Sequence, residues 1–182
     1  MTERIDPSAR VHPTAEVEDD VSIGPRTAVW SHAHLRVGAS IGRDCIIGEK
    51  CVLGPGVRIG DLCKLNTAAF LPHGVTLETG VMVSAHVVFT NDRTPRATDG
   101  SLSELRSSDP DEHTLATVVR RGASIGANAT IGPGLELGEF CMIGMGSVVT
   151  KDVPAFALAV GNPARVVGRV DEAGEIVETL GD

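Results

Sequence analysis

Residues 41–54 read Ile-Gly-Arg-Asp-Cys-Ile-Ile-Gly-Glu-Lys-Cys-Val-Leu-Gly, and every sixth position is an aliphatic residue followed by glycine. The same step of six runs in both directions from this stretch. Apolar anchors stand at Ile5, Val11, Val17, Ile23, Val29, Leu35, Ile41, Ile47, Leu53, Ile59, Leu65, Leu71, Leu77, Val83 and Phe89, and again at Val119, Ile125, Ile131, Leu137, Ile143 and Val149. Ordinary strands alternate apolar and polar residues with a period of two, so a period of six kept this long indicates a repeat architecture.

Each six-residue unit predicts one short strand, and three units predict one turn of a parallel β-helix with eighteen residues per turn. The anchor side chain points inward, and the glycine that often follows it is expected to supply turn conformations that a Cβ would resist. The residue two positions before each anchor is usually small and faces the crowded corner. All four cysteines occupy that position, which predicts buried structural thiols: Cys45, Cys51, Cys63 and Cys141.

The repeat also predicts the boundaries of the chain's parts. A β-helix domain spans residues 1–153, with one long loop insertion over residues 90–116, where prolines, charges and serines replace the anchors. A loop of that length inside a compact domain usually has a function. The repeat stops after Val153, so residues 154–182 form a short C-terminal extension whose last residues are expected to be a helix or a strand.

Charge and hydropathy exclude several classes of partner. The formal net charge is −8 and no basic stripe is present, which argues against nucleic acid. No apolar run approaches the roughly 20 residues that a membrane-spanning helix needs. The first ten residues lack the apolar core of a signal peptide, so the sequence predicts a cytoplasmic protein.

Over nearly its whole length the chain resembles the hexapeptide-repeat acyltransferases. That family coils left-handed, so the resemblance implies an all-β, left-handed parallel β-helix, a handedness that the periodicity alone does not give. The tail stretches Val-Val-Thr-Lys-Asp-Val-Pro (148–154) and Gly-Asn-Pro-Ala-Arg (161–165) look like the family's coenzyme A-binding end. The resemblance implies acetyl-CoA as cosubstrate, no metal, and cofactor contacts at Gly126, Asn128, Gly144, Met145, Gly146, Lys151, Asn162, Pro163 and Arg165. Lys151 and Arg165 are the expected phosphate-binding cations.

A narrower resemblance lies in Val-Phe-Thr-Asn-Asp-Arg-Thr-Pro-Arg-Ala (88–97) and in residues 119–131. These stretches are similar to N-acetyltransferases that act on the 3-amino group of UDP- or dTDP-linked amino sugars. The resemblance implies that Asn91 lies on the sugar amine and that Asp92 and Arg96 also bind the substrate. It further implies a homotrimer with its sites between adjacent subunits.

Acyl transfer from a thioester to an amine needs positioning, a donor for the developing oxyanion and a proton acceptor. A turn of eighteen residues stacks His73 under Asn91 at one corner, while His86 lies one face back. Asn91 cannot act as a base, so His73, His86 or water takes the proton. The oxyanion donor is expected to be a backbone N–H near Gly126 or Gly144.

Two other functions remain open at this point. One is a metal-dependent hydratase of the carbonic anhydrase type, with three histidines gathered across a trimer interface. The other is a β-helix protein that binds ligands without catalysis, since a fold does not imply a function. Stoichiometric zinc or iron would indicate the first, and ligand binding without turnover would indicate the second.

Overall fold

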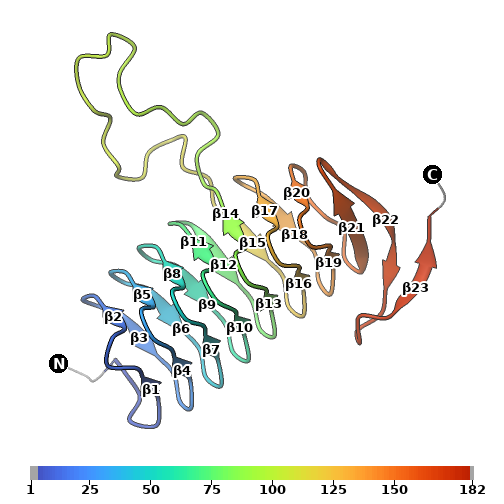
Figure 1. Ribbon diagram of the computed structural model, residues 1–182, viewed down its shortest axis with the longest axis horizontal. Coiled ribbons are helices and arrows are strands. Elements are labelled where there is room, and N and C mark those ends of the chain that lie inside the picture. The colour runs from blue at the N-terminus through green and yellow to red at the C-terminus, as the bar shows by residue number, and fades with distance from the viewer. Residues whose placement is uncertain (1–3, 181–182) are drawn as a thin grey trace.

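From β1 to β20 the chain winds through three sheets in turn, so that each sheet receives every third strand (Figure 1). The computed structural model describes residues 4–180, and that range contains strands, turns and loops but no helix. In particular, no helix among these residues is long and apolar enough to cross a bilayer.

The three sheets are named here by their first strands. The β1 sheet contains, in spatial order, β1 (Arg10–Val11), β4 (Ala28–Val29), β7 (Ile46–Ile47), β10 (Lys64–Leu65), β13 (Met82–Val83), β16 (Ser124–Ile125), β19 (Met142–Ile143), β21 (Ala157–Gly161), β22 (Ala164–Val170) and β23 (Ile176–Thr179). The β2 sheet contains β2 (Glu16–Val17), β5 (His34–Leu35), β8 (Val52–Leu53), β11 (Phe70–Leu71), β14 (Val88–Phe89), β17 (Thr130–Ile131) and β20 (Val148–Val149). The β3 sheet contains β3 (Ser22–Ile23), β6 (Ser40–Ile41), β9 (Arg58–Ile59), β12 (Val75–Leu77), β15 (Thr117–Val119) and β18 (Glu136–Leu137).

Strand pairing between neighbouring coils is parallel and keeps a register of eighteen residues. Ile23 pairs with Ile41, and Leu35 pairs with Leu53. Across the long loop the separation is larger, since Val83 pairs with Ile125, but an anchor still pairs with an anchor. The left-handed parallel β-helix expected from the sequence is therefore the fold of the chain, and the loop insertion leaves the stacking intact.

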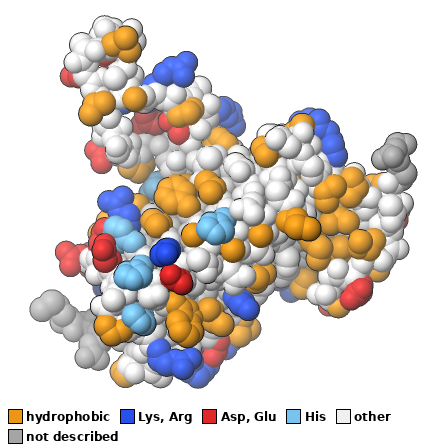
Figure 2. All heavy atoms as spheres, viewed as in Figure 1, with side chains coloured by type: hydrophobic (Ala, Val, Ile, Leu, Met, Phe, Trp, Pro, Cys, Tyr) orange, Lys and Arg blue, Asp and Glu red, His pale blue; other side chains and the backbone are white. Residues whose placement is uncertain are grey.

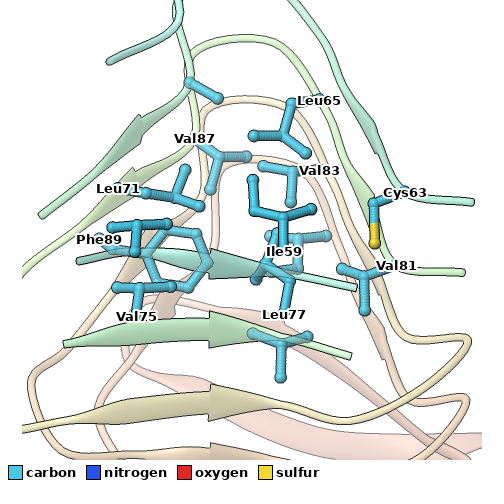
Figure 3. Packing of buried hydrophobic residues seen from close by; sticks show 14 of the residues in the cluster. Ile59, Cys63, Leu65, Leu71, Val75, Leu77, Val81, Val83, Val87 and Phe89 are labelled. Atoms are coloured by element: carbon cyan, nitrogen blue, oxygen red, sulfur yellow. The ribbon is translucent and has the colours of Figure 1, made fainter. Parts of the chain in front are cut away.

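The anchor side chains fill the interior of the coil (Figure 3). Leu65, Leu71 and Phe89 are completely buried there, and each buried aliphatic side chain contributes about 1.5–3 kcal/mol to folding. The four cysteines are buried and free of disulfides, as their place in the repeat predicts. Because every coil repeats the same small contacts, the chain has a continuous core with few aromatic residues.

The glycine that follows many anchors has a different role from the one expected. Gly54 does not have a positive φ; instead, a Cβ placed there would lie 2.7 Å from the backbone nitrogen of His73 in the next coil. Gly42 is similarly packed against the backbone of Gly60 and Asp61. The left-handed turn residue stands two positions later, as at Asp44 (φ 56°). These glycines are therefore required because stacked coils approach closely, and the turn conformation belongs to another position.

The loop leaves the β-helix after β14 and returns at β15, so it starts and ends at the corner between the β2 and β3 sheets, called here the β2/β3 corner. It projects from the body as a long arm (Figure 1). Isolated antiparallel bridges join Asp92 to Thr114 and Thr98 to Leu105 across it.

The C-terminal extension is made of strands. β21 pairs in parallel with β19 and then turns back into β22 and β23, which are antiparallel. The pairing of the β-helix thus runs past residue 153 into the extension. Ala157 and Ala159 of β21 are buried against the last coil, so the extension closes that end of the core.

Candidate active site

A cleft of about 580 Å³ lies between the loop and the β2/β3 corner. Its walls come from β8 and β11, from the turns that follow β5, β8 and β11, and from several parts of the loop. Four of the residues singled out from the sequence line it: His73, Asn91, Asp92 and Arg96. Figure 2 shows acidic and basic side chains on the loop and where the loop meets the body.

The imidazole of His73 has a defined orientation in this cleft. Its Nδ1 lies 2.9 Å from the carbonyl oxygen of Pro55, which stands at the same corner one coil earlier. A carbonyl oxygen only accepts hydrogen bonds, so Nδ1 must carry the proton and donate it. In the neutral ring the other nitrogen, Nε2, then has a free lone pair. His73 is half-buried, so this lone pair belongs to a side chain that is partly shielded from water.

Asn91 stacks on His73 as the eighteen-residue turn predicts. The side-chain Nδ2 of Asn91 donates to the backbone carbonyl of His73 over 3.1 Å. The backbone carbonyl of Asn91 accepts from the N–H of Leu115 over 2.7 Å. No donor among residues 4–180 contacts the side-chain oxygen, Oδ1. The cleft thus places a fixed amide oxygen beside a histidine whose tautomer is set by the backbone.

Asp92 and Arg96 lie at the start of the loop and reach the same cleft. One carboxylate oxygen of Asp92 accepts from the N–H of Thr94 over 2.7 Å. Arg96 is exposed, and among residues 4–180 its side chain donates only to the neighbouring carbonyl of Pro95, at 3.1 Å. Most of its guanidinium donors therefore remain available to a ligand.

His86 takes a different position from the other proton-acceptor candidate. It is exposed, has a positive φ of 58°, and stands at the corner between the β1 and β2 sheets, called here the β1/β2 corner. Its N–H donates to the carbonyl of Thr67 in the coil below. Within one chain, His86 therefore lies across the β2 sheet from the cleft and does not join His73 there.

Part of the cleft is apolar and was not foreseen from the sequence. Phe70 faces outward from β11 with 40% of its surface exposed, and Val37, Val52 and Pro72 complete this wall. The repeat could have predicted part of this wall. Steps of eighteen residues back from Asn91 lead to His73, Pro55 and Val37, which therefore stack at one corner of successive coils. Arg36 precedes that column and also lines the cleft.

A second groove, of about 220 Å³, lies near the last coil and contains Lys151 and Arg165. Both side chains are exposed, and the apolar part of the groove is formed by Val149, Val153, Ala159, Ala164 and Val166. Lys151 follows β20 at the β2/β3 corner, whereas Arg165 reaches the groove from β22. The two cations that the tail motif singled out thus come together in space although 14 residues separate them.

The other predicted cofactor residues lie along the opposite edge of the β2 sheet. Asn128 and Gly146 stack at the β1/β2 corner, where the N–H of Gly146 donates to the carbonyl of Ala127 over 2.8 Å. The remaining residues of this group lie at the same corner or at the turn between β21 and β22: Gly126, Gly144, Met145, Asn162 and Pro163. Met145 is 84% exposed. The two groups of predicted cofactor residues therefore flank the outer face of β17 and β20.

The outer face of the β2 sheet connects the cleft with the second groove. β11, β14, β17 and β20 are consecutive in this sheet. Neighbouring strands lie about 4.8 Å apart, so three such steps span roughly 15 Å. The outward residues after Phe70 along this track are Val88, Thr130 and Val148, which have no charge. The outer face of these strands is therefore uncharged at each of these positions.

Another hollow, of about 630 Å³, lies on the β3 sheet and contains none of the predicted site residues. Three of its four carboxylates are in ion pairs, because Arg120 bridges Glu78 and Glu136 at 2.8 Å each and Arg121 pairs with Glu139 at 3.2 Å. The hydrogen bond from Arg120 lowers the pKa of Glu136. We interpret this hollow as a surface network of ion pairs and not as a ligand site. No three histidine, cysteine, aspartate or glutamate side chains within residues 4–180 are grouped so as to hold a metal ion.

Comparison with known families is consistent with this fold. Residues 116–151 match the model for "Bacterial transferase hexapeptide (six repeats)", and residues 38–71 match that for "Hexapeptide repeat of succinyl-transferase". The chain carries the hexapeptide repeat of bacterial transferases. The family resemblance noted in the sequence is thereby confirmed.

Curated relatives match this hexapeptide-repeat chain over part of their length. A dTDP-3-amino-3,6-dideoxy-alpha-D-galactopyranose 3-N-acetyltransferase of Aneurinibacillus thermoaerophilus is 59% identical over 54 residues, which are 30% of this chain and 28% of the relative. A putative acetyltransferase of Staphylococcus aureus is 52% identical over 46 residues, or 25% of this chain and 23% of the relative. A serine acetyltransferase of Arabidopsis thaliana is 32% identical over 117 residues, or 64% of this chain and 31% of the relative. The matched segments thus span less than a third of each of these relatives.

Solved structures share the fold of the hexapeptide-repeat chain. An N-acyltransferase from Bacillus cereus, in complex with dTDP and 3-hydroxybutyryl-CoA, superposes with a TM-score of 0.58 at 16% identity, covering 96% of this chain and 81% of the other. A hexapeptide transferase family protein from Anaplasma phagocytophilum gives a TM-score of 0.59 at 15% identity, covering 93% and 80%. At these identities the likeness concerns the β-helix itself.

Proposed function

We propose that the protein is an N-acetyltransferase that moves an acetyl group from acetyl-CoA to an amino group of a nucleotide-linked sugar. One observation carries the proposal. A single cleft holds the Oδ1 of Asn91, a possible acceptor for an amine N–H, beside a His73 whose Nε2 lone pair is kept free by the Pro55 carbonyl.

The proposed reaction is a direct attack of the amine on the thioester. The nitrogen lone pair forms a bond to the carbonyl carbon while the C–S bond breaks, and the sulfur leaves as the coenzyme A thiol. The amine proton passes to Nε2 of His73, which returns a proton to the departing thiolate. Asn91 orients the amine through Oδ1. Positioning of this kind supplies on the order of 7–11 kcal/mol in favourable cases, and a placed base adds about 10²–10⁴-fold.

Acetyl-CoA is assigned to the outer face of the β2 sheet near its C-terminal end. Lys151 and Arg165 meet the phosphates in the second groove, where their side chains are exposed and share one hollow. The pantetheine arm follows β20 and β17 toward the cleft, flanked by Gly126, Asn128, Gly144, Met145 and Gly146 on one side. Asn162 and Pro163, at the tip of the β21–β22 turn, close the end of this track. Support comes from the roughly 15 Å separation between groove and cleft, which an extended chain can bridge.

For the acceptor, we assign the C3 amino group of a UDP- or dTDP-linked sugar. The support is the segment that is 59% identical to a dTDP-3-amino-sugar N-acetyltransferase, together with Asn91, Asp92 and Arg96 in the cleft. His86 remains a second candidate for the proton acceptor only if a neighbouring subunit brings it to the cleft.

We also propose a homotrimer. The monomer leaves several large apolar side chains uncovered, among them Trp30 at 54% and Met145 at 84% exposure. Exposed apolar groups of this size are typical of surfaces that other chains cover. A trimer would place the open side of each cofactor track against a neighbouring β-helix.

A thiol-release assay tests the proposed function. Purified protein is incubated with acetyl-CoA and a panel of 3-amino and 4-amino sugars linked to UDP or dTDP, with L-serine as a non-sugar amine. One free thiol and one acetylated product are expected per turnover for a 3-amino nucleotide sugar. Thiol release with serine alone, or with no amine in the panel, would reject the proposed substrate class.

A further inference from the structure

We infer that Arg36 and Arg106, acting with Arg96, bind the diphosphate of a nucleoside diphosphate in the cleft. The inference rests on the proposed function, because it specifies how the nucleotide part of the acceptor is recognised. Of these three arginines, the sequence resemblance implied only Arg96 as a substrate-binding residue. The structure brings the other two arginines to the same cleft from opposite walls, Arg36 from the β-helix and Arg106 from the loop.

The guanidinium group of Arg36 is hydrogen-bonded to the protein through its Nε. Its Nε donates to Oε1 of Glu18 over 3.3 Å, and the other Glu18 oxygen accepts from the N–H of Val37 over 2.9 Å. His34 contacts the same carboxylate at 2.8 Å. The Val37 N–H and the His34 ring lower the pKa of Glu18, so the carboxylate stays ionised beside Arg36. Among residues 4–180 the terminal nitrogens of Arg36 contact no acceptor, and they are the donors left for a ligand.

Arg106 has an equivalent arrangement on the loop. One terminal nitrogen donates to Oδ2 of Asp111 over 3.0 Å, and its backbone N–H donates to the carbonyl of Ala97 over 3.1 Å. All its neighbours from residue 101 to residue 112 are exposed, but Arg106 is half-buried against the cleft. The loop therefore turns this one side chain inward and holds it by one carboxylate.

The acidic side chains of the cleft have local partners. Asp92 accepts from the Thr94 N–H, and Asp109 accepts from the hydroxyl of Ser107 over 2.8 Å. These contacts use carboxylate oxygens within the loop itself. Each guanidinium group has five N–H donors, so some of them are not used by the contacts within the protein. Its planar fork also fits phosphate oxygens better than the point charge of a lysine does.

The positive charges of the arginines favour an anionic ligand in the cleft. The chain has a net charge of −8, so a ligand with two negative charges needs cations gathered locally. Three arginines from three segments gather around the cleft, while its three aspartates, Asp92, Asp109 and Asp111, each accept a hydrogen bond from within the loop. Because Arg36 and Arg106 stand on opposite walls, a diphosphate between them would also join the loop to the β-helix.

Calorimetric titration of the full chain with dTDP and with UDP tests the inference. Each arginine is expected to contribute a charge-assisted hydrogen bond, so R36Q and R106Q should each weaken dTDP binding by about 10- to 100-fold. Acetyl-CoA binding should not change, because the second groove lies on other coils. R58Q is the matched control, since Arg58 is exposed on β9 of the β3 sheet outside the cleft, and it should bind dTDP like the wild type.

R36Q also removes the contact with Glu18, so R36K is a second variant at this position. Lysine keeps a charge for Glu18 but lacks the fork, and dTDP binding should weaken severalfold at an unchanged melting temperature. Wild-type dTDP affinity in both Arg36 variants and in R106Q would overturn the inference. Binding of neither dTDP nor UDP by the wild type would also overturn it, even if thiol release with another amine kept the acetyltransferase assignment in place. Absence of thiol release with every amine would instead reject the proposed function.

Discussion

The Nδ1 atom of His73 lies 2.9 Å from the carbonyl oxygen of Pro55, and the two residues are one coil apart at the same corner. The tautomer of the ring is thus set by the backbone of a neighbouring coil, with no orienting side chain. The register of the β-helix also fixes Asn91, whose amide donates to the carbonyl of His73 itself. A column of stacked residues, repeated every eighteen positions, therefore orients both groups proposed to handle the amine.

Replacing His73 by glutamine tests its role as the proton acceptor. H73Q should lower kcat by about 10²-fold or more, because a positioned base contributes 10²–10⁴-fold. KM for the nucleotide sugar should change little, because glutamine is close in size to histidine. The readouts are steady-state kinetics and the pH profile of kcat.

The matched control for this experiment is H86N. Asparagine tolerates the left-handed φ of 58° at His86, so the fold should be preserved. Turnover in H86N should stay near the wild type. Equal losses in the two variants would contradict the assignment of the base to His73.

The register predicts a sharp loss of activity when the Asn91 side chain is removed. N91A eliminates Oδ1, the proposed acceptor for the amine, and the bond to the His73 carbonyl. We expect kcat/KM to fall by roughly 10- to 100-fold, while the circular dichroism spectrum and strand content stay unchanged. N91D retains the oxygen acceptors but cannot donate to His73, so it separates the two contacts. Wild-type turnover in N91A would remove Asn91 from the site.

The sequence could predict the part of the site that lies on the repeat. Stepping by eighteen placed His73 below Asn91, and the structure has them there. Arg106 could not be found in that way, because the loop has no period and the inward position of this side chain follows from the loop's own hydrogen bonds. The reason why position 54 is glycine could not be predicted either. In the sequence, a glycine required by close approach between coils looks the same as a glycine required by a turn.

Gly54 links the fold to the site, because its missing Cβ makes room for the coil that carries His73. A methyl group there would lie 2.7 Å from the His73 nitrogen and 2.8 Å from the Pro72 carbonyl carbon. G54A should therefore destabilise the protein by about 1–3 kcal/mol and lower turnover, as overpacking usually does. G100A is the control, since nothing lies within 4 Å of that position on the loop. Chemical denaturation measures both, and equal stabilities would show that the coils can move apart at little cost.

Lys151 and Arg165 are expected to act on coenzyme A and not on the nucleotide sugar. K151Q and R165Q should each weaken acetyl-CoA binding by about tenfold and leave dTDP binding unchanged. Deleting the whole extension would be uninformative, because Ala157 and Ala159 of β21 close the core. Removing the chain from Asp171 onward is the better truncation, since β23 is exposed throughout and its loss should spare both ligands. If K151Q weakened the binding of acetyl-CoA and of dTDP equally, the role of Lys151 would be structural.

The homotrimer is tested through the chain's single tryptophan. Trp30 is 54% exposed in one chain and lies in a shallow apolar hollow with Val11 and Val29. Light scattering should give three times the mass of one 19.0 kDa chain. If a neighbouring subunit covers the indole, acrylamide should quench its fluorescence weakly in the assembled protein and strongly after dissociation by dilution. W30S should shift the equilibrium toward smaller species, because burial of a large aromatic side chain dominates the energy of most interfaces. A monomer at micromolar concentration, with an indole fully open to the quencher, would refute both the trimer and this contact.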